Sequence, residues 1–156
     1  MRSIVVCLAV AAAAAGCGSD TVFGIGEQGS LARHEQQWKS QSLHAYEFDL
    51  VQDKFGYTSN VRVTVMADTI YSVVDKDTGL PPAFYAGYPT IDDLFASARA
   101  ALSAKSVTVT LEYDEHLGYP TRFSAVSNSN DPGGPYSAQV SNLVAVANVL
   151  ASSRTR

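Results

Sequence analysis

Apolar side chains recur at every second position in several separate segments of the chain, and this spacing constrains the fold more than any other feature. It is clearest in residues 107–113, where Val107, Val109, Leu111 and Tyr113 alternate with Thr and Glu. A period of two places alternate side chains on opposite faces of a strand, so each such segment predicts a half-buried strand. Strands that are apolar on one face are typical of antiparallel sheets.

The same spacing predicts further strands, at residues 44–52, 60–66, 69–74, 121–126 and the start of 136–150. In the first of these, Glu47 and Asp49 occupy the solvent-facing positions. Short links between consecutive segments favour antiparallel hairpins. For residues 144–150 the pattern fits strand and helix equally well, and both remain open.

Two helices are predicted between and before these strands. The first runs from Leu31 to Gln41, with Ser30 as its N-cap and Trp38 as the residue that docks it onto the sheet. The second follows Thr90, a good N-cap, and its apolar face consists of Ile91, Leu94, Phe95, Ala98 and Leu102. We therefore expect an α+β domain, with an antiparallel sheet of about five to six strands and two helices packed on one face.

The N-terminus carries an export signal. Arg2 precedes an uncharged apolar run, Ile4 to Ala15, which is shorter than the roughly 20 residues that span a bilayer. The run ends in Ala-Ala-Ala-Gly before Cys17, which resembles the bacterial lipobox, although Ala14 stands where most lipoboxes carry Leu. The resemblance implies that residues 1–16 are removed and that Cys17 receives lipid, palmitate included. The alternative is ordinary cleavage after Ala15, which would leave Cys17 a free thiol.

Residues 17–30 are interpreted as a lipid-attached flexible tether, because glycines are frequent there. The spacing Gly24-x-Gly26-x-x-Gly29 matches a dinucleotide fingerprint, but a signal peptide precedes it instead of a strand, so these are taken as linker glycines. Residues 31–150 then form a single domain. Once Cys7 is removed with the signal, one cysteine remains and no internal disulfide is possible.

The charge of the chain disfavours nucleic acid as a partner. The formal net charge is −4, and removal of Arg2 with the signal makes it −5. Phosphate binding needs clustered Lys and Arg, which this chain does not show. We therefore expect the partners to be a membrane, through the lipid, and an envelope protein or a small ligand.

Three motifs together resemble a family of short bacterial exported proteins of unknown function, many of which look like lipoproteins. The first is a Trp helix followed by a Tyr-x-Phe strand, and the second is a Thr-Ile-Asp-Asp-Leu-Phe helix start. The third is a Tyr-Asp-x-x-x-Gly-Tyr-Pro hairpin. The matching residues are Trp38, Tyr46, Phe48, Thr90 to Phe95, and Tyr113, Asp114, Gly118, Tyr119 and Pro120. That family has no established activity, so the resemblance does not point to one.

The hairpin motif has a structural explanation. Gly118 suits a turn that needs positive φ, and Pro120 suits the first residue of a strand. Tyr113 and Tyr119 are expected to pair across the hairpin.

Candidate chemistry is sparse. Asp114, Glu115 and His116 stand together in the same turn and are the residues on which a hydrolase would depend. Asp75-x-Asp77-x-Gly79 begins like a calcium loop but lacks the later Gly and Glu of that pattern. We predict no metal site and no cofactor.

The best candidate for binding is the long connection after residue 75, which contains Phe84, Tyr85 and Tyr88. Loops of this length are often functional, and aromatic side chains are enriched at interfaces. The sequence thus favours a non-enzymatic, lipid-anchored binding module in the cell envelope, facing the periplasm or the cell exterior. A protease-inhibitor-like or chaperone-like envelope module is the alternative, and a hydrolase using Asp114 and His116 is a further one.

Overall fold

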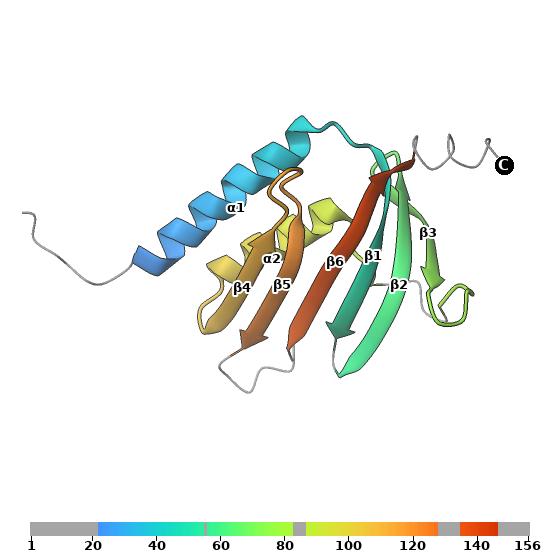
Figure 1. The fold of residues 1–156 in the computed structure, drawn as a ribbon. Coiled ribbons are helices and arrows are strands. Elements are labelled where there is room, and N and C mark those ends of the chain that lie inside the picture. Colours follow the sequence, from blue (N-terminus) through green and yellow to red (C-terminus); the bar gives the residue numbers. More distant parts are fainter. Residues whose placement is uncertain (1–21, 55, 83–86, 128–134, 147–156) are drawn as a thin grey trace, which may run out of the picture.

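The structure, a computed structural model, describes residues 22–54, 56–82, 87–127 and 135–146. Two helices and six strands follow one another along the chain (Figure 1). They are α1 (Val22–Ser40), β1 (Ala45–Lys54), β2 (Tyr57–Met66), β3 (Thr69–Asp75), α2 (Ile91–Ser103), β4 (Val107–Tyr113), β5 (Pro120–Ser127) and β6 (Tyr136–Ala145).

The six strands form one antiparallel sheet in the order β3-β2-β1-β6-β5-β4. Each half is a three-stranded meander, and the halves meet where β6 pairs with β1, placing Leu50 opposite Val140. The connection that contains α2 carries the chain from β3 at one edge to β4 at the other (Figure 1). The predicted α+β class and the antiparallel sheet are confirmed.

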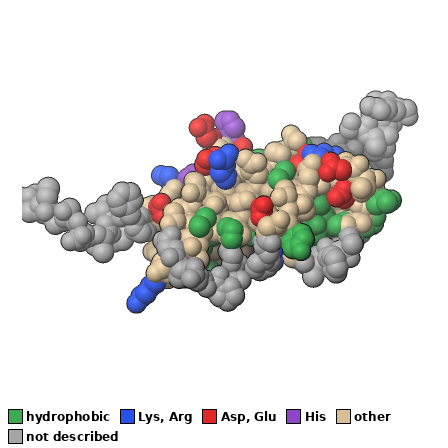
Figure 2. Space-filling model, turned by 90° about the horizontal axis from the view of Figure 1, so that it is seen from below, with side chains coloured by type: hydrophobic (Ala, Val, Ile, Leu, Met, Phe, Trp, Pro, Cys, Tyr) green, Lys and Arg blue, Asp and Glu red, His purple; other side chains and the backbone are tan. Residues whose placement is uncertain are grey.

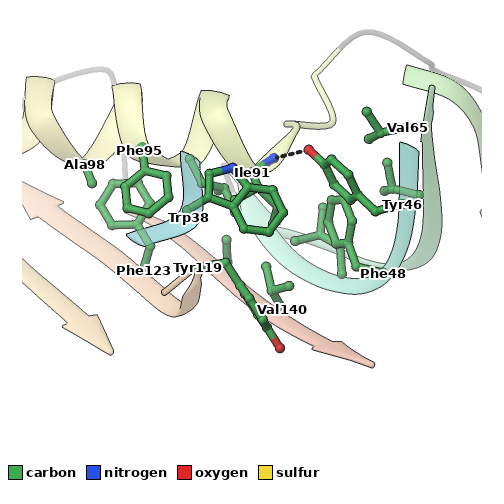
Figure 3. Close-up of a cluster of buried hydrophobic side chains, with 14 of the residues drawn as sticks. Trp38, Tyr46, Phe48, Val65, Ile91, Phe95, Ala98, Tyr119, Phe123 and Val140 are labelled. Carbon is green, nitrogen blue, oxygen red and sulfur yellow. Dashed lines mark hydrogen bonds between the residues drawn. The ribbon is translucent and has the colours of Figure 1, made fainter. Parts of the chain in front are cut away.

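One face of the sheet carries the core, as the two-residue period predicts. Tyr46, Phe48 and Leu50 of β1 lie opposite Val65, Val63 and Val61 of β2, and all six are buried. Residues opposite each other in a ladder share a face, so these pairs form a continuous apolar surface. Figure 3 shows how side chains of both helices and of β1, β2, β5 and β6 meet there.

Helix α2 begins after Thr90 and buries its apolar face, both as predicted. Thr90 forms a complete capping box with Asp93, and Ile91, Leu94, Phe95 and Ala98 are buried. The helix contacts β4 and β5. Its first turn is also bound to the sheet, because the backbone N–H of Ile91 donates to the Tyr46 hydroxyl at 3.2 Å (Figure 3).

Helix α1 begins earlier than predicted. Residues 22–30, expected to belong to a flexible tether, are helical, so Gly26 and Gly29 are exposed helix residues and not linker glycines. Ser30 is therefore not an N-cap, and its hydroxyl lies 3.4 Å from His34 Nδ1. Once residues 31–40 are docked, the helix extends towards its N-terminus without a new nucleation cost, although each Gly costs roughly 1 kcal/mol.

Trp38 attaches α1 to the rest of the domain, as expected. Its side chain is 3% exposed, and its ring meets the Tyr46 ring edge-on at 5.2 Å. Glu35 adds ion pairs to Arg99 of α2 and, at 2.7 Å, to Lys39. Within the residues that the structure describes, no helix is long and apolar enough to cross a membrane.

At the other end, β6 extends to Ala145, so Val144 is in a strand. The rest of the segment that the sequence left open, from residue 147 on, lies outside the described residues, as do residues 1–21 with Cys17.

Candidate functional site

The Tyr-Asp-x-x-x-Gly-Tyr-Pro hairpin is a closed turn whose polar groups bind one another. The Asp114 carboxylate accepts the backbone N–H groups of His116 at 3.0 Å and of Leu117 at 2.7 Å. The Asp114 N–H donates to the Tyr119 carbonyl at 2.9 Å, and the Gly118 N–H donates to the Asp114 carbonyl at 3.0 Å. Asp114 is thus engaged in shaping the turn.

Gly118 lets this turn approach helix α1. Its φ is +82°, and a Cβ built there would lie 2.7 Å from the His34 carbonyl oxygen and 2.9 Å from Gln37 Cβ. The Gln37 amide in turn donates to the carbonyls of Glu115 at 2.9 Å and His116 at 3.1 Å. The motif therefore acts as the surface on which α1 docks.

Tyr113 and Tyr119 do not pair with each other across the hairpin as expected, and each contacts a ring of α1. The Tyr113 ring stacks on His34 at 3.9 Å, and the Tyr119 ring meets Trp38 edge-on at 6.3 Å. In the strand register Tyr113 lies opposite Pro120, which begins β5 as predicted. Because the chain already turns before Pro120, each tyrosine is directed to α1 instead of to the other.

The three polar residues of the turn do not form a recognisable reaction centre. Glu115 and His116 are exposed, and the Asp114 carboxylate is engaged as above. No group of three or more His, Cys, Asp or Glu side chains that could hold a metal occurs within the described residues. At the suspected calcium loop, Asp75 Oδ1 accepts the N–H groups of Asp77 and Thr78 and so caps a turn.

A pocket of about 460 Å³ lies beside α2, over β5 and β6. Tyr88, from the predicted aromatic binding loop, lines it, whereas Phe84 and Tyr85 lie outside the described residues. This pocket, called the α2 pocket below, is lined by Lys54, Gly87, Tyr88, Pro89, Asp93, Ser97, Ala101, Phe123, Ala125 and Tyr136.

The α2 pocket exists because small side chains face large ones across it. Asp93, Ser97 and Ala101 are spaced four residues apart and so form one stripe along the helix. Opposite them lie Phe123 and Tyr136, whose ring centroids are 5.5 Å apart. Burial raises the pKa of Tyr136 to about 12.

Gln52 connects the walls of the α2 pocket through hydrogen bonds at the long limit of the range. The Tyr136 hydroxyl donates to Gln52 Oε1 at 3.4 Å, and Gln52 Nε2 donates to the Gly87 carbonyl at 3.4 Å. Gln52 is buried at a position where the alternation of β1 calls for an apolar residue. That polar residue on the apolar face is the signal in the sequence that could have located the pocket.

The end of the sheet where β1 ends and β2 begins is apolar at its surface. Figure 2, which views the molecule from below, shows hydrophobic side chains gathered on this side. Among the large ones, Tyr57 is 82% exposed and Leu80 is 64% exposed.

A buried carboxylate lies on the opposite face of the sheet. Asp49, predicted to face solvent, is 3% exposed and accepts Arg62 Nε at 2.8 Å, Lys76 Nζ at 2.7 Å and Asn142 Nδ2 at 2.9 Å. Burial alone would raise the pKa of Asp49, but these three donors hold it well below its ordinary value. The cluster joins β1, β2, β6 and the turn after β3, so its role is structural.

Comparison with known proteins gives a family and no activity. The family described as "Family of unknown function (DUF6174)" matches residues 30–144. No curated protein and no solved structure matches the chain.

Proposed function

The chain belongs to the DUF6174 family of unknown function, and on the geometry of its own residues we propose that it is a non-enzymatic binding module of the bacterial cell envelope, anchored by lipid on Cys17. The observation that supports binding is the α2 pocket, to which the aromatic loop leads through Tyr88. The module would bind an apolar group there, belonging to a small molecule or to an envelope protein.

The size and walls of the α2 pocket support this proposal. Small-molecule sites are typically concave, between about 300 and 1,000 Å³, mostly apolar, and supplied with a few polar groups that fix orientation. This pocket has about 460 Å³ and aromatic walls from Tyr88, Phe123 and Tyr136. Lys54 and Asp93 supply the charged groups.

The anchor follows from the apolar run before Cys17, and the structure changes how the anchor would work. Helix α1 begins at Val22, which leaves four residues between Cys17 and the helix. Because α1 is docked from Leu31 on, residues 22–30 are the part that could act as a stiff arm, about 14 Å long at about 1.5 Å per residue. We propose that this arm, with both helices on the core face of the sheet, holds the domain at a defined distance from the bilayer.

A substitution that fills the α2 pocket tests the binding proposal. Ala101 lines the pocket, whereas its neighbour Ala100 is exposed on α2 and does not. The probe is N-phenyl-1-naphthylamine, a neutral apolar fluorophore, added to the intact chain in lipid nanodiscs with empty nanodiscs subtracted. We expect saturable binding that Ala101→Trp lowers at least tenfold and that Ala100→Trp leaves unchanged.

The outcome that rejects the proposal is equally specific. If the probe binds no better than to empty nanodiscs, or if both Trp variants bind it equally well, the α2 pocket is not a binding site. Circular dichroism of each variant shows whether the fold is retained.

Substitution of the aromatic loop gives an independent test. The triple change Phe84→Ala, Tyr85→Ala and Tyr88→Ala removes the Tyr88 ring from the pocket wall, so we expect probe affinity to fall while circular dichroism stays unchanged. Retained affinity would show that the loop plays no part in binding.

A further inference from the structure

We infer that the chain associates with a second copy of itself along the edge of β4, so that two six-stranded sheets join into one continuous antiparallel sheet. The association is independent of the α2 pocket and of the lipid anchor. It follows from the different ways in which the two edges of the sheet end, and from the residues that β4 carries.

The two outer strands of the sheet, β3 and β4, differ in regularity (Figure 1). In β3, Tyr71 has no opposite residue on β2 and so forms a bulge in the middle of the strand. A bulge at an edge disrupts the ladder and hinders the addition of a further strand. Along β4 the register with β5 is unbroken from Val107 to Glu112, and the extra residue beyond that point, Thr121, belongs to β5. The regular edge is therefore β4.

The sequence of β4 carries none of the residues that usually block an edge. It reads Val-Thr-Val-Thr-Leu-Glu-Tyr, without Lys, Arg or Pro, and Glu112 is its one charge. Its residues are mostly β-branched or aromatic, which favours strand pairing. Among the described residues, the helices meet β4 from the core face through α2, and at its last residue, Tyr113, through the stacked ring of His34.

The core-facing side chains of β4 are only half-buried. They are Val107, Val109, Leu111 and Tyr113. In the interior of the sheet the corresponding side chains are fully buried, as at Phe48 of β1. A strand added at the β4 edge would cover apolar surface that one copy of the chain leaves exposed to water, and the removal of such surface from water favours association.

The strand is complementary to itself in the antiparallel direction. Opposite residues of a ladder share a face, so core-facing residues must meet core-facing residues. The register that pairs all seven residues of β4 places Thr110 opposite Thr110 of the second copy. On the core face Val109 then meets Leu111, and the two Glu112 side chains lie on opposite sides of the centre, so like charges do not oppose. Such a pairing closes with two-fold symmetry.

Charges introduced at Thr110 test this inference. Sedimentation equilibrium of the intact chain in density-matched detergent micelles measures the dissociation constant of the dimer. We expect the wild-type chain to dimerise, and Thr110→Lys and Thr110→Asp each to raise the constant at least tenfold, because like charges then face each other. An equimolar mixture of the two variants should regain the wild-type constant, since Lys then faces Asp. The control Ser124→Lys, on the same face but one strand further in, should leave it unchanged.

Cysteine at Thr110 gives a second test, in membranes. Opposite residues of an antiparallel pair have Cα atoms about 4.5–5.5 Å apart, a separation that a disulfide bridges. Oxidation with copper phenanthroline should therefore link Thr110→Cys into a dimer on non-reducing gels. Ser124→Cys should stay unlinked like the wild type, because three strand spacings, roughly 14 Å, would separate the two residues.

Several results would overturn the association. They are a wild-type chain that stays monomeric, a Thr110→Lys variant that dimerises as well as the wild type, and a mixture of the charged variants that does not recover. Equal cross-linking of Thr110→Cys and Ser124→Cys would overturn it as well. Circular dichroism checks the fold of each variant, and the small change to Cys keeps the second test valid if a charged variant unfolds.

Discussion

Replacing Gly118 by Ala should weaken the docking of α1 on the hairpin and so lower the stability of the domain. The substitution adds one methyl group, at a position where φ is +82° and where three atoms of α1 lie between 2.7 and 3.0 Å from the new Cβ. One of these atoms is the His34 carbonyl oxygen, which belongs to the helix backbone and cannot rotate away. The strain must then be relieved by moving the helix or the turn.

The expected loss of stability has two contributions, one from the backbone conformation and one from packing. Holding an L-residue at positive φ costs about 1–2 kcal/mol. Forcing an extra carbon into a filled space costs about 1–3 kcal/mol more. Gly118→Ala should therefore lower the free energy of unfolding by about 2–5 kcal/mol, a large share of the roughly 5–15 kcal/mol that stabilises a typical domain.

A comparison with Gly79 separates the backbone contribution from the packing contribution. Gly79 also has positive φ, at +71°, but a Cβ there would meet no atom within 4 Å. Gly79→Ala should thus cost only the backbone part, about 1–2 kcal/mol. Urea denaturation of the intact chain and both variants, followed by Trp fluorescence, reports directly on α1 because Trp38 is the one Trp.

A small difference between the two variants would refute the reasoning. If Gly118→Ala and Gly79→Ala lose the same stability to within about 0.5 kcal/mol, the close approach of the turn to α1 contributes nothing measurable.

Three further predictions concern the Asp49 cluster, the helix cap and the anchor. Asp49→Asn should cost about 2–3 kcal/mol at pH 7, because two cations lose their buried partner, although both are partly exposed. The pKa of Asp49 is lowered on folding, so its contribution is present above its ordinary pKa and is lost as the pH falls towards its folded pKa. Stability measured from pH 6 to pH 2 should accordingly fall less steeply in Asp49→Asn, and an identical slope would contradict this. Thr90→Ala should cost about 1 kcal/mol in urea denaturation by removing the capping box, and no loss would show the cap to be dispensable. Cys17→Ala should move the protein from the membrane to the soluble fraction after fractionation, and mass spectrometry of the wild type should show an acylated N-terminus at Cys17, whereas an unmodified chain starting at Gly16 would exclude the anchor.

The strands and α2 could be predicted because their signals are local. A two-residue period fixes which side chains face the core, and Thr90 with Asp93 marks where α2 begins. The start of α1 could not, because Gly26 and Gly29 look like linker residues until the docked part of the helix is known. Local composition does not include that tertiary contribution.

The α2 pocket could not be predicted from the sequence, for a different reason. Periodicity gives the faces of strands but not their order, and the pocket depends on β6 lying between β1 and β5. That order brings Lys54 and Tyr136 together with Ala101, residues that are far apart in the chain. Asp49 shows the converse case, since the alternation places it on the outer face correctly but cannot tell that Arg62 and Lys76 cover it.

The most direct test of the proposed site is to map a bound probe on the intact chain. Amide chemical shifts should be recorded by NMR in nanodiscs while N-phenyl-1-naphthylamine is added. The account predicts that the largest changes fall on Ala101, Ala125 and Tyr136, around the α2 pocket. Changes confined to the opposite face of the sheet, at Val51 and Ser124, would contradict it.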